Sequence, residues 1–180
     1  MGLKAALESI LRLGNAAPAT HAPPVSMVLL LRAERFPNLE QLRDAAEKAY
    51  GRKFSGDKSS AHCVYQQILF TLARVGPHTL SFMFYTKPYD EEYRALGNSW
   101  ALPNQRTAWA EHTAWIAVDY AKGELDLEAR YALLARFCAE LYDDNCVGVY
   151  LPREGAFIPG ASSVRNMLSR AIASRNVDIE

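Results

Sequence analysis

Cysteine is scarce in this chain, and its spacing argues against the usual roles of paired thiols. The 180 residues contain three cysteines, Cys63, Cys138 and Cys146. The number is odd, and no two of them have the C-x-x-C spacing, which disfavours a disulfide framework and a thiolate zinc site. Cys138 falls on an apolar helical face and Cys146 opens an apolar run, so both are predicted to be small buried side chains. The pattern indicates a reducing compartment.

An excess of charge of either sign is also absent. Lys and Arg together number 20, Asp and Glu together also number 20, and the formal net charge is zero. Nucleic-acid-binding proteins usually carry a basic excess or a basic stripe. Here most basic residues have acidic neighbours, as in residues 32–35 (RAER). We therefore expect no nucleic acid among the partners of this protein.

Long apolar runs are missing as well. No stretch approaches the roughly 18 apolar residues that a membrane-spanning helix needs. Residues 1–13 form an amphipathic pattern that Glu8 and Arg12 interrupt, so they do not resemble a secretory signal. We expect a cytoplasmic protein with no membrane span.

Motifs that position a cofactor, a metal ion or a nucleophile are equally absent. The chain contains no HExxH, GxGxxG, P-loop or GxSxG sequence. No two of its four histidines have the i, i+4 spacing of a helical zinc site; they are His21, His62, His78 and His112. We therefore predict neither a metal site nor a cofactor.

The chain does contain enough apolar sequence for one globular domain. Hydrophobic residues make up 49% of it and charged residues 22%, both near the average of globular proteins. Residues 1–24 comprise a predicted amphipathic helix followed by a linker rich in Pro and Ala. Because proline favours extended chain over helix, this segment is predicted to be an appendage. Residues 25–180 are predicted to form a single α+β domain.

Hydrophobic periodicity gives the order of the expected elements in that domain. Apolar or alternating runs predict strands at residues 25–31, 64–75, 79–85, 112–120 and 146–151. Amphipathic spacing predicts helices at residues 39–51 and 126–142, a short helix at 90–96, a helical turn at 107–111 and a last helix from Ser162. Residues 155–160 are expected to be a loop and residues 175–180 a frayed tail.

This order predicts an α+β fold with a mixed β-sheet of about five strands and helices packed mainly on one face. Two β-α units flank a hairpin whose turn contains Gly76 and Pro77. Such an arrangement is typical of split β-α-β folds. The N-terminal helix is an addition to this core.

Three short segments carry a resemblance to a known family. They are the apolar strand at residues 27–31 with the helix at 39–51, residues 111–118 (EHTAWIAV), and residues 147–150 (VGVY) with the glycine-containing loop and closing helix after them. Together they resemble a family of bacterial stand-alone domains of unknown function, which has a similar His-x-Ala strand start. The resemblance covers roughly residues 25–173. The family has no known catalytic residues, so the resemblance implies no activity and no site residues for this chain.

Side chains that could do chemistry are few. His112 follows Glu111 at a predicted junction of loop and strand, where working side chains are common. A histidine there could serve as a general base; the alternative is that it binds nearby backbone and fixes the entry to the strand. Cys63 could act as a nucleophile only if folding brings a base such as His112 beside it. These three residues are the candidates for catalysis.

Aromatic residues gather in the middle of the chain. They are Tyr85, Tyr89, Tyr93, Trp100, Trp109 and Trp115. Because Tyr and Trp are enriched in binding interfaces, these residues could line a groove for a protein or a ligand. The alternative is that they pack a long loop onto the sheet. Trp115 is the best surface candidate, since it lies on the polar side of an alternating strand.

These observations favour a non-catalytic protein-binding protein, such as an adaptor or an immunity-type accessory factor, with another protein as its partner. Two alternatives remain open. One is a small hydrolase or transferase with His112 as general base and Glu111, Asp119 or Cys63 nearby. The other is a homo-oligomeric structural subunit that docks through the N-terminal helix.

Overall fold

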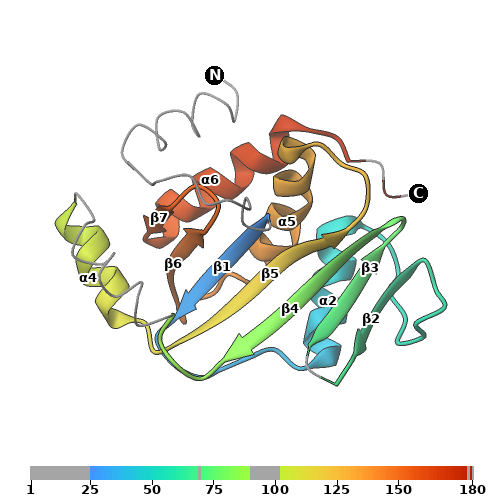
Figure 1. The fold of residues 1–180 in the computed structure, drawn as a ribbon, viewed down its shortest axis with the longest axis horizontal. Coiled ribbons are helices and arrows are strands. Elements are labelled where there is room, and N and C mark those ends of the chain that lie inside the picture. The colour runs from blue at the N-terminus through green and yellow to red at the C-terminus, as the bar shows by residue number, and fades with distance from the viewer. Residues whose placement is uncertain (1–24, 69, 90–101, 178, 180) are drawn as a thin grey trace, which may run out of the picture.

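The computed structural model describes residues 25–68, 70–89, 102–177 and 179. The strands within them are β1 (Ser26–Leu31), β2 (His62–Gln66), β3 (Thr71–Val75), β4 (His78–Tyr85), β5 (Ala114–Lys122), β6 (Cys146–Leu151) and β7 (Ala156–Pro159). The helices are α2 (Leu39–Tyr50), α4 (Pro103–Glu111), α5 (Leu127–Leu141) and α6 (Ala161–Ser174). All the strands belong to one sheet in the order β2-β3-β4-β5-β1-β6-β7 (Figure 1). The predicted α+β class is confirmed.

Every pair of neighbouring strands in this sheet is antiparallel. β5 and β6 run parallel to each other, but β1 lies between them, so α5 connects two parallel strands across an antiparallel one (Figure 1). This is a split β-α-β arrangement. The expectation of a mixed sheet is wrong, because antiparallel strands separate the parallel ones at each crossover. The sheet also has seven strands, more than the sequence predicts.

Two segments account for the additional strands. The run predicted as one strand at residues 64–75 is two strands, β2 and β3, joined by a turn in which the Gln67 N–H donates to the Phe70 carbonyl (2.8 Å). β7 lies in the segment predicted as a loop and pairs with β6. That pairing is a tertiary contact, which the local pattern of residues 155–160 does not contain.

Helix boundaries follow the local signals of the sequence. The Asn38 side chain accepts a hydrogen bond from the Gln41 N–H (2.9 Å), and the Gln41 side chain accepts one from the Asn38 N–H (2.8 Å), which forms a capping box for α2. Gly51 ends α2 in the left-handed conformation, with φ of 64°. The Asp126 side chain caps α5 by accepting from the Ala129 N–H (2.8 Å). The caps explain why these two helices begin where the sequence predicts.

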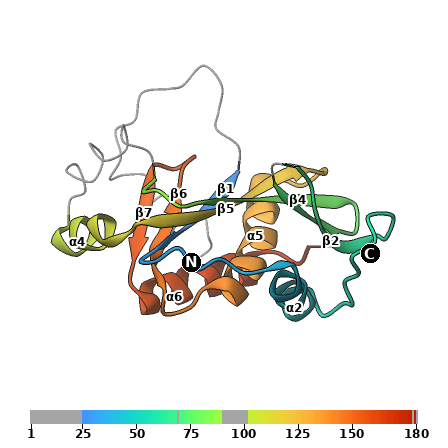
Figure 2. The ribbon, with the colours of Figure 1, turned by 90° about the horizontal axis from the view of Figure 1, so that it is seen from below.

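Three of the described helices, α2, α5 and α6, cover one face of the sheet (Figure 2). The main core lies between these helices and the sheet. Its largest fully buried side chains include Leu29, Phe82, Tyr131, Leu134 and Phe137. Because burial of apolar surface contributes about 25 cal/mol per Å², this layer supplies most of the free energy that opposes unfolding. The predicted placement of helices mainly on one face is confirmed for the described residues.

The other face of the sheet, called the outer face below, carries a second and smaller apolar cluster. Strand alternation directs Val28 and Ala117 to this side, whereas Ile116 and Val118 enter the main core. α4 reaches the cluster at the end of the sheet formed by β6 and β7, where Trp109 joins it. β1 is therefore buried on both sides, which agrees with its uninterrupted run of apolar residues from Met27 to Leu31.

The segment after α6 packs onto the domain, so the prediction of a frayed tail is wrong for its described part. Val177 and Ile179 are each 8% exposed and belong to the main core. Arg175 forms an ion pair with Glu128 (3.3 Å), and a ring nitrogen of His62 lies 3.1 Å from the carbonyl oxygen of Ile179. These partners belong to α5 and β2, so only the folded chain reveals them.

Several predictions fall on other parts of the chain. The helix and linker predicted for residues 1–24 and the short helix predicted at residues 90–96 lie outside the described residues. The helical turn predicted at residues 107–111 is the second half of α4, which begins earlier, at Pro103. Proline suits the first turn of a helix because its missing N–H has no intrahelical partner there.

Candidate functional site

Tyr85 and Trp115 form an exposed aromatic pair on the outer face. They are cross-strand partners on β4 and β5, their ring centroids are 4.2 Å apart and their ring planes differ by 12°. Tyr85 is 47% exposed, and Trp115 is half-buried beneath it. A stacked pair of this kind offers a rigid, amphipathic surface whose ordering on binding costs little conformational entropy.

Tyr89 connects this pair to the second apolar cluster. Its ring lies edge-on to Trp115 at a centroid distance of 4.9 Å and edge-on to Tyr150 at 5.4 Å. Residues 86–89, which directly follow β4, therefore bring the Tyr89 ring onto the outer face. Two of the six aromatic residues singled out in the sequence, Tyr93 and Trp100, lie outside the described residues.

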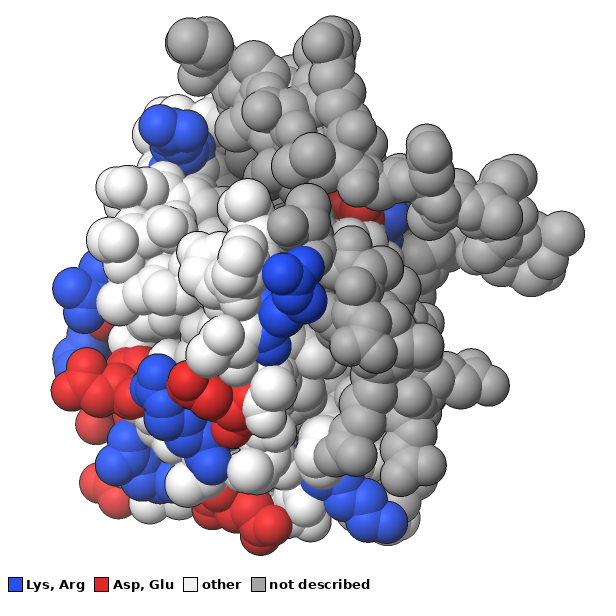
Figure 3. Space-filling view, turned by 90° about the vertical axis from the view of Figure 1, so that its left-hand side faces the viewer, with Lys and Arg blue, Asp and Glu red and all other residues white. Residues whose placement is uncertain are grey.

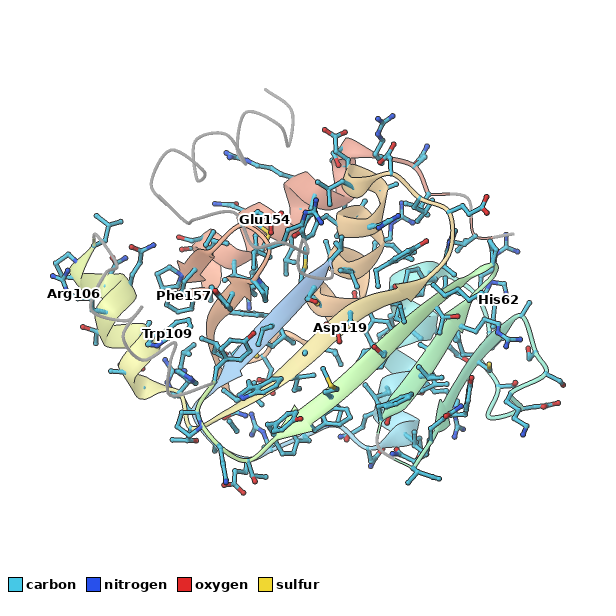
Figure 4. All side chains as sticks on the ribbon, in the orientation of Figure 1. His62, Arg106, Trp109, Asp119, Glu154 and Phe157 are labelled. Atoms are coloured by element: carbon cyan, nitrogen blue, oxygen red, sulfur yellow. The ribbon has the colours of Figure 1, made fainter. Side chains whose placement is uncertain are left out.

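Trp109 is packed differently from Tyr85. It is 3% exposed, and its ring lies edge-on to Tyr150 (5.3 Å) and Phe157 (5.2 Å), with the side chains drawn in Figure 4. Gln105, one turn earlier in α4, donates from its side-chain amide to the Phe157 carbonyl (2.9 Å). Trp109 therefore anchors α4 to the sheet and does not offer a free surface.

The described surface on the α4 side of the molecule is largely uncharged in its upper part, and Lys, Arg, Asp and Glu side chains gather lower down (Figure 3). Ion pairs on the described surface include Arg32 with Glu111 (3.3 Å) and Arg35 with Asp143 (3.0 Å). Charges of opposite sign are thus mixed in this view, and the described residues show no continuous stripe of one sign there.

His112 lies at the end of α4 and is 4% exposed. Its Nε2 accepts a hydrogen bond from the Tyr89 N–H (2.9 Å), and its Nδ1–H donates to the Trp109 carbonyl oxygen. Both ring nitrogens thus bind backbone groups, which fits a neutral imidazole with its proton on Nδ1. These are the contacts expected if His112 binds nearby backbone and fixes the entry to the strand, which is the alternative to a role as general base. Proton transfer by His112 would require one of these hydrogen bonds to break.

Of the other candidate catalytic residues, Glu111 is the chain neighbour of His112, whereas Cys63 and Asp119 lie apart from it. The Glu111 carboxylate points to Arg32 in an exposed ion pair. Cys63 lies on β2, and both β3 and β4 separate that strand from β5. Cys63 is fully buried, and burial raises the pKa of its thiol. Asp119 lies on β5 at roughly 23 Å from His112, given about 3.3 Å per residue. The fold therefore does not assemble these groups into one reaction centre.

Asp119 occupies a different setting, in a row of three polar residues across the outer face. Its cross-strand neighbours are Ser26 on β1 and Ser81 on β4, and the side chains of both form hydrogen bonds with its carboxylate. Burial raises the pKa of Asp119, and the two serine hydrogen bonds act in the opposite direction. Figure 4 shows Asp119 at the middle of the sheet.

Sequence reasoning placed Asp119 on the polar side of its strand but did not find this row. The alternation of residues 113–120 gives the side of the strand on which Asp119 lies. The two serines come from strands that are distant along the chain, and only the register of β1 and β4 against β5 brings them beside Asp119.

A pocket of about 290 Å³ opens on the opposite, helix-covered side of the molecule. Its apolar part comes from Leu31, Phe36 and Ile116, and its rim carries side chains of both charge signs from α2 and from the end of α5. Because those charged side chains are exposed and of mixed sign, the pocket does not define a ligand of one chemistry.

The described residues hold no group of three or more His, Cys, Asp or Glu side chains that could bind a metal ion. None of the described helices has the length and the apolar character needed to cross a membrane. Comparisons with protein-family models, with curated proteins and with solved structures found no match. The described residues therefore form an α+β domain with a seven-stranded antiparallel sheet.

Proposed function

We propose that this protein is a non-catalytic binding protein of the adaptor or immunity type, which recognises another protein through the outer face of its sheet. The observation that carries the proposal is the exposed stack of Tyr85 on Trp115. Tyr and Trp residues dominate the binding energy of many interfaces, because they bury a large area and lose little conformational freedom.

The surroundings of the stack support the same role. Tyr89 and the second apolar cluster hold Trp115 from below, so the exposed ring of Tyr85 rests on a rigid base. Preorganised side chains bind at a lower entropic cost than mobile ones. The neighbouring Met83, which is half-buried, lies on the same side of β4 as Tyr85 and packs against the second apolar cluster.

The hydrolase or transferase alternative receives less support. His112 uses both ring nitrogens to bind backbone groups. The Glu111 carboxylate is in an ion pair with Arg32, and Asp119 and Cys63 lie at other places in the sheet.

The alternative of a homo-oligomer that docks through the N-terminal helix rests on residues 1–24, which lie outside the described residues. Deleting residues 1–24 and measuring the mass in solution tests it; an unchanged oligomeric state would count against it.

The binding proposal is tested by quantitative capture with the full-length protein from a lysate of the source organism. The variants are Tyr85→Ala and, as a matched control, Leu127→Ala, which removes an apolar side chain that is 38% exposed at the start of α5. We expect one captured protein to be reduced at least about tenfold by Tyr85→Ala and retained by the control, as for an interface hot spot.

Two results would contradict the proposal. One is capture of the same proteins at equal levels by the wild type, Tyr85→Ala and Leu127→Ala. The other is turnover of a substrate by the wild type that is abolished in His112→Gln when the fold of the variant is intact, because that result would make the protein an enzyme.

A further inference from the structure

The sheet ends in two edge strands, β2 and β7, and the fold covers them differently. At β7, the Gln105 side chain of α4 donates to the Phe157 carbonyl (2.9 Å). At β2, the Ser55 N–H donates to the His62 carbonyl (3.1 Å), and the Ser55 carbonyl accepts from the Val64 N–H (2.9 Å). Figure 1 shows the loop that contains Ser55 beside the start of β2. The printed contacts of this loop with the edge of β2 thus end at Val64.

The second half of β2 keeps an open edge. The Val64 N–H points away from β3 to Ser55, and backbone direction alternates along a strand, so the N–H and carbonyl of Gln66 also point away from β3. The Gln66 side chain is held in its own hairpin, where it accepts from the Thr71 hydroxyl (2.8 Å) and donates to the Gln67 carbonyl (2.9 Å). Within the described parts of the chain, no group bonds the Gln66 backbone on its open side.

The sequence around this edge lacks the residues that usually protect one. Residues 62–68 (HCVYQQI) contain no Lys, Arg, Asp, Glu or Pro. Charged side chains and proline are common means of keeping an edge strand from pairing with another chain. Ile68 is 98% exposed, more than the other exposed large apolar side chains of the described residues. The open edge therefore combines free backbone groups with an exposed apolar side chain.

We propose that Gln66 pairs with Gln66 of a second copy of this chain, so that two β2 strands run antiparallel across a two-fold axis. This inference is independent of the proposed function. Each Gln66 N–H donates to the Gln66 carbonyl of the other copy, and Ile68 comes opposite Val64 of that copy. The contact of Ser55 with β2 limits the register, because a second strand shifted further toward His62 would collide with Ser55.

A second copy is the partner that suits this edge. A two-fold contact brings identical surfaces together, so every charge on the edge would lie near a charge of the same sign. Residues 62–68 avoid this repulsion because they contain no acidic residue, lysine or arginine. The open half of one strand offers much less area than the roughly 1,200 Å² that stable interfaces bury. We therefore expect a weak dimer whose population rises with concentration.

The test measures the mass of the full-length protein by sedimentation equilibrium from about 20 µM to about 1 mM, which suits a weak contact. We expect the wild type to move from monomer toward dimer over this range. Gln66→Pro removes the central N–H at an edge position that tolerates proline, and Ile68→Lys adds a charge to the edge; each should weaken association at least about tenfold. Leu102→Lys is the matched control, because it adds the same charge at an apolar side chain that is 52% exposed beside α4, which contacts β7 and not β2. It should associate like the wild type.

Backbone amide NMR signals locate the contact. Signals of residues 64–68 should shift as the wild-type concentration rises, and spectra of the dilute variants show that they are folded. If Gln66→Pro fails to fold, Ile68→Lys decides, because its side chain is exposed in the monomer. The inference is overturned if the wild type stays monomeric over the whole range, or if the folded variants associate as strongly as the wild type. Shifts confined to other residues, such as 1–24, would overturn it as well.

Discussion

Tyr85 and Trp115 face each other on the outer side of β4 and β5, while the residues next to them in the chain, Phe84 and Ile116, pair on the inner side. Phe84 and Ile116 pack in the main core. The two strands are thus joined by an exposed aromatic pair on one side and by core side chains on the other. This arrangement restricts the motion of the exposed pair of Tyr85 and Trp115.

A double-mutant cycle on Tyr85→Ala and Trp115→Ala should give a coupling free energy of about 0.5–1.5 kcal/mol, the usual value for an aromatic pair. The measurement is the free energy of unfolding in urea. A cycle on Tyr85→Ala and Leu127→Ala provides the control, because these residues lie on opposite faces of the sheet and should show no coupling beyond about 0.5 kcal/mol. Equal coupling in both cycles would mean that the stack contributes nothing specific.

Asp119→Asn should raise the stability of the free protein at neutral pH relative to the wild type. Burial raises the pKa of Asp119 above 3.8, its ordinary value, so the unfolded chain releases this proton at a lower pH than the folded chain does. The wild type therefore loses stability as the pH rises from about 4 through the raised pKa of Asp119. The advantage of the Asn variant should appear over that window, stay constant above it and vanish in acid. Urea unfolding across the pH range measures it.

Asp57→Asn is a control of opposite sign for that experiment. Hydrogen bonds from the backbone and side chain of Ser59 lower the pKa of Asp57, so its carboxylate stabilises the folded state above the ordinary pKa of 3.8. That stability is lost as the pH falls through the lowered pKa. The Asn variant should therefore be the less stable one at neutral pH. If Asp57→Asn and Asp119→Asn changed the free energy of unfolding in the same direction at neutral pH, the burial of Asp119 would not be the cause of the effect of Asp119→Asn.

His112→Ala should lower the free energy of unfolding by about 1–3 kcal/mol, because it leaves buried backbone groups without their partner. The hydrogen bond from the Tyr89 N–H to Nε2 gives a local readout. Hydrogen exchange at the Tyr89 amide should become faster in this variant and stay slow in His62→Ala, whose ring contacts Ile179 instead. Unchanged exchange at Tyr89 would show that His112 does not hold this segment in solution.

Gly148→Ala should destabilise the protein by about 1–3 kcal/mol, the usual cost of overpacking. An added Cβ would lie 2.5 Å from Cε2 of Phe157 and 2.6 Å from the backbone oxygen of Ile158, so β7 would have to move. Gly56→Ala is the matched control, since its Cβ would meet Arg43 side-chain atoms at 3.6 Å, an ordinary contact. Thermal unfolding of the two variants measures the difference. A Gly148→Ala protein as stable as Gly56→Ala would contradict the close packing of β6 against β7.

The three thiols should not react with Ellman's reagent in the native state at neutral pH. All three cysteines are buried, and burial raises the pKa of Cys63, of Cys138 and of Cys146, the last to about 12. Because the thiolate is the reactive form, both access and ionisation oppose the reaction. The coloured product of Ellman's reagent should appear once the protein is unfolded in urea. Fast labelling of Cys63 in the folded protein would restore it as a candidate nucleophile.

The local structure of this protein could be predicted from its residues. Asn38 and Asp126 hydrogen-bond to backbone N–H groups within three residues, and Gly51 ends a helix through its own backbone conformation. The alternation along β5 likewise separates the core residues from those of the outer face. Such signals act between residues that are close in the chain, so the α+β class and most element boundaries follow from them.

The order of the strands and the candidate site depend on contacts between distant parts of the chain. The segment of β7 carries no clear strand pattern, and it becomes a strand because β6 offers it a partner. Asp119 becomes notable only when the register of β1 and β4 places Ser26 and Ser81 on either side of it. The sequence thus determined most of the segments that are helices or strands, β7 excepted, and which side of each is apolar. Only the tertiary structure decided which side chains meet, because hydrogen-bonded pairing between strands depends on the geometry of the whole sheet and not on the pattern within one segment.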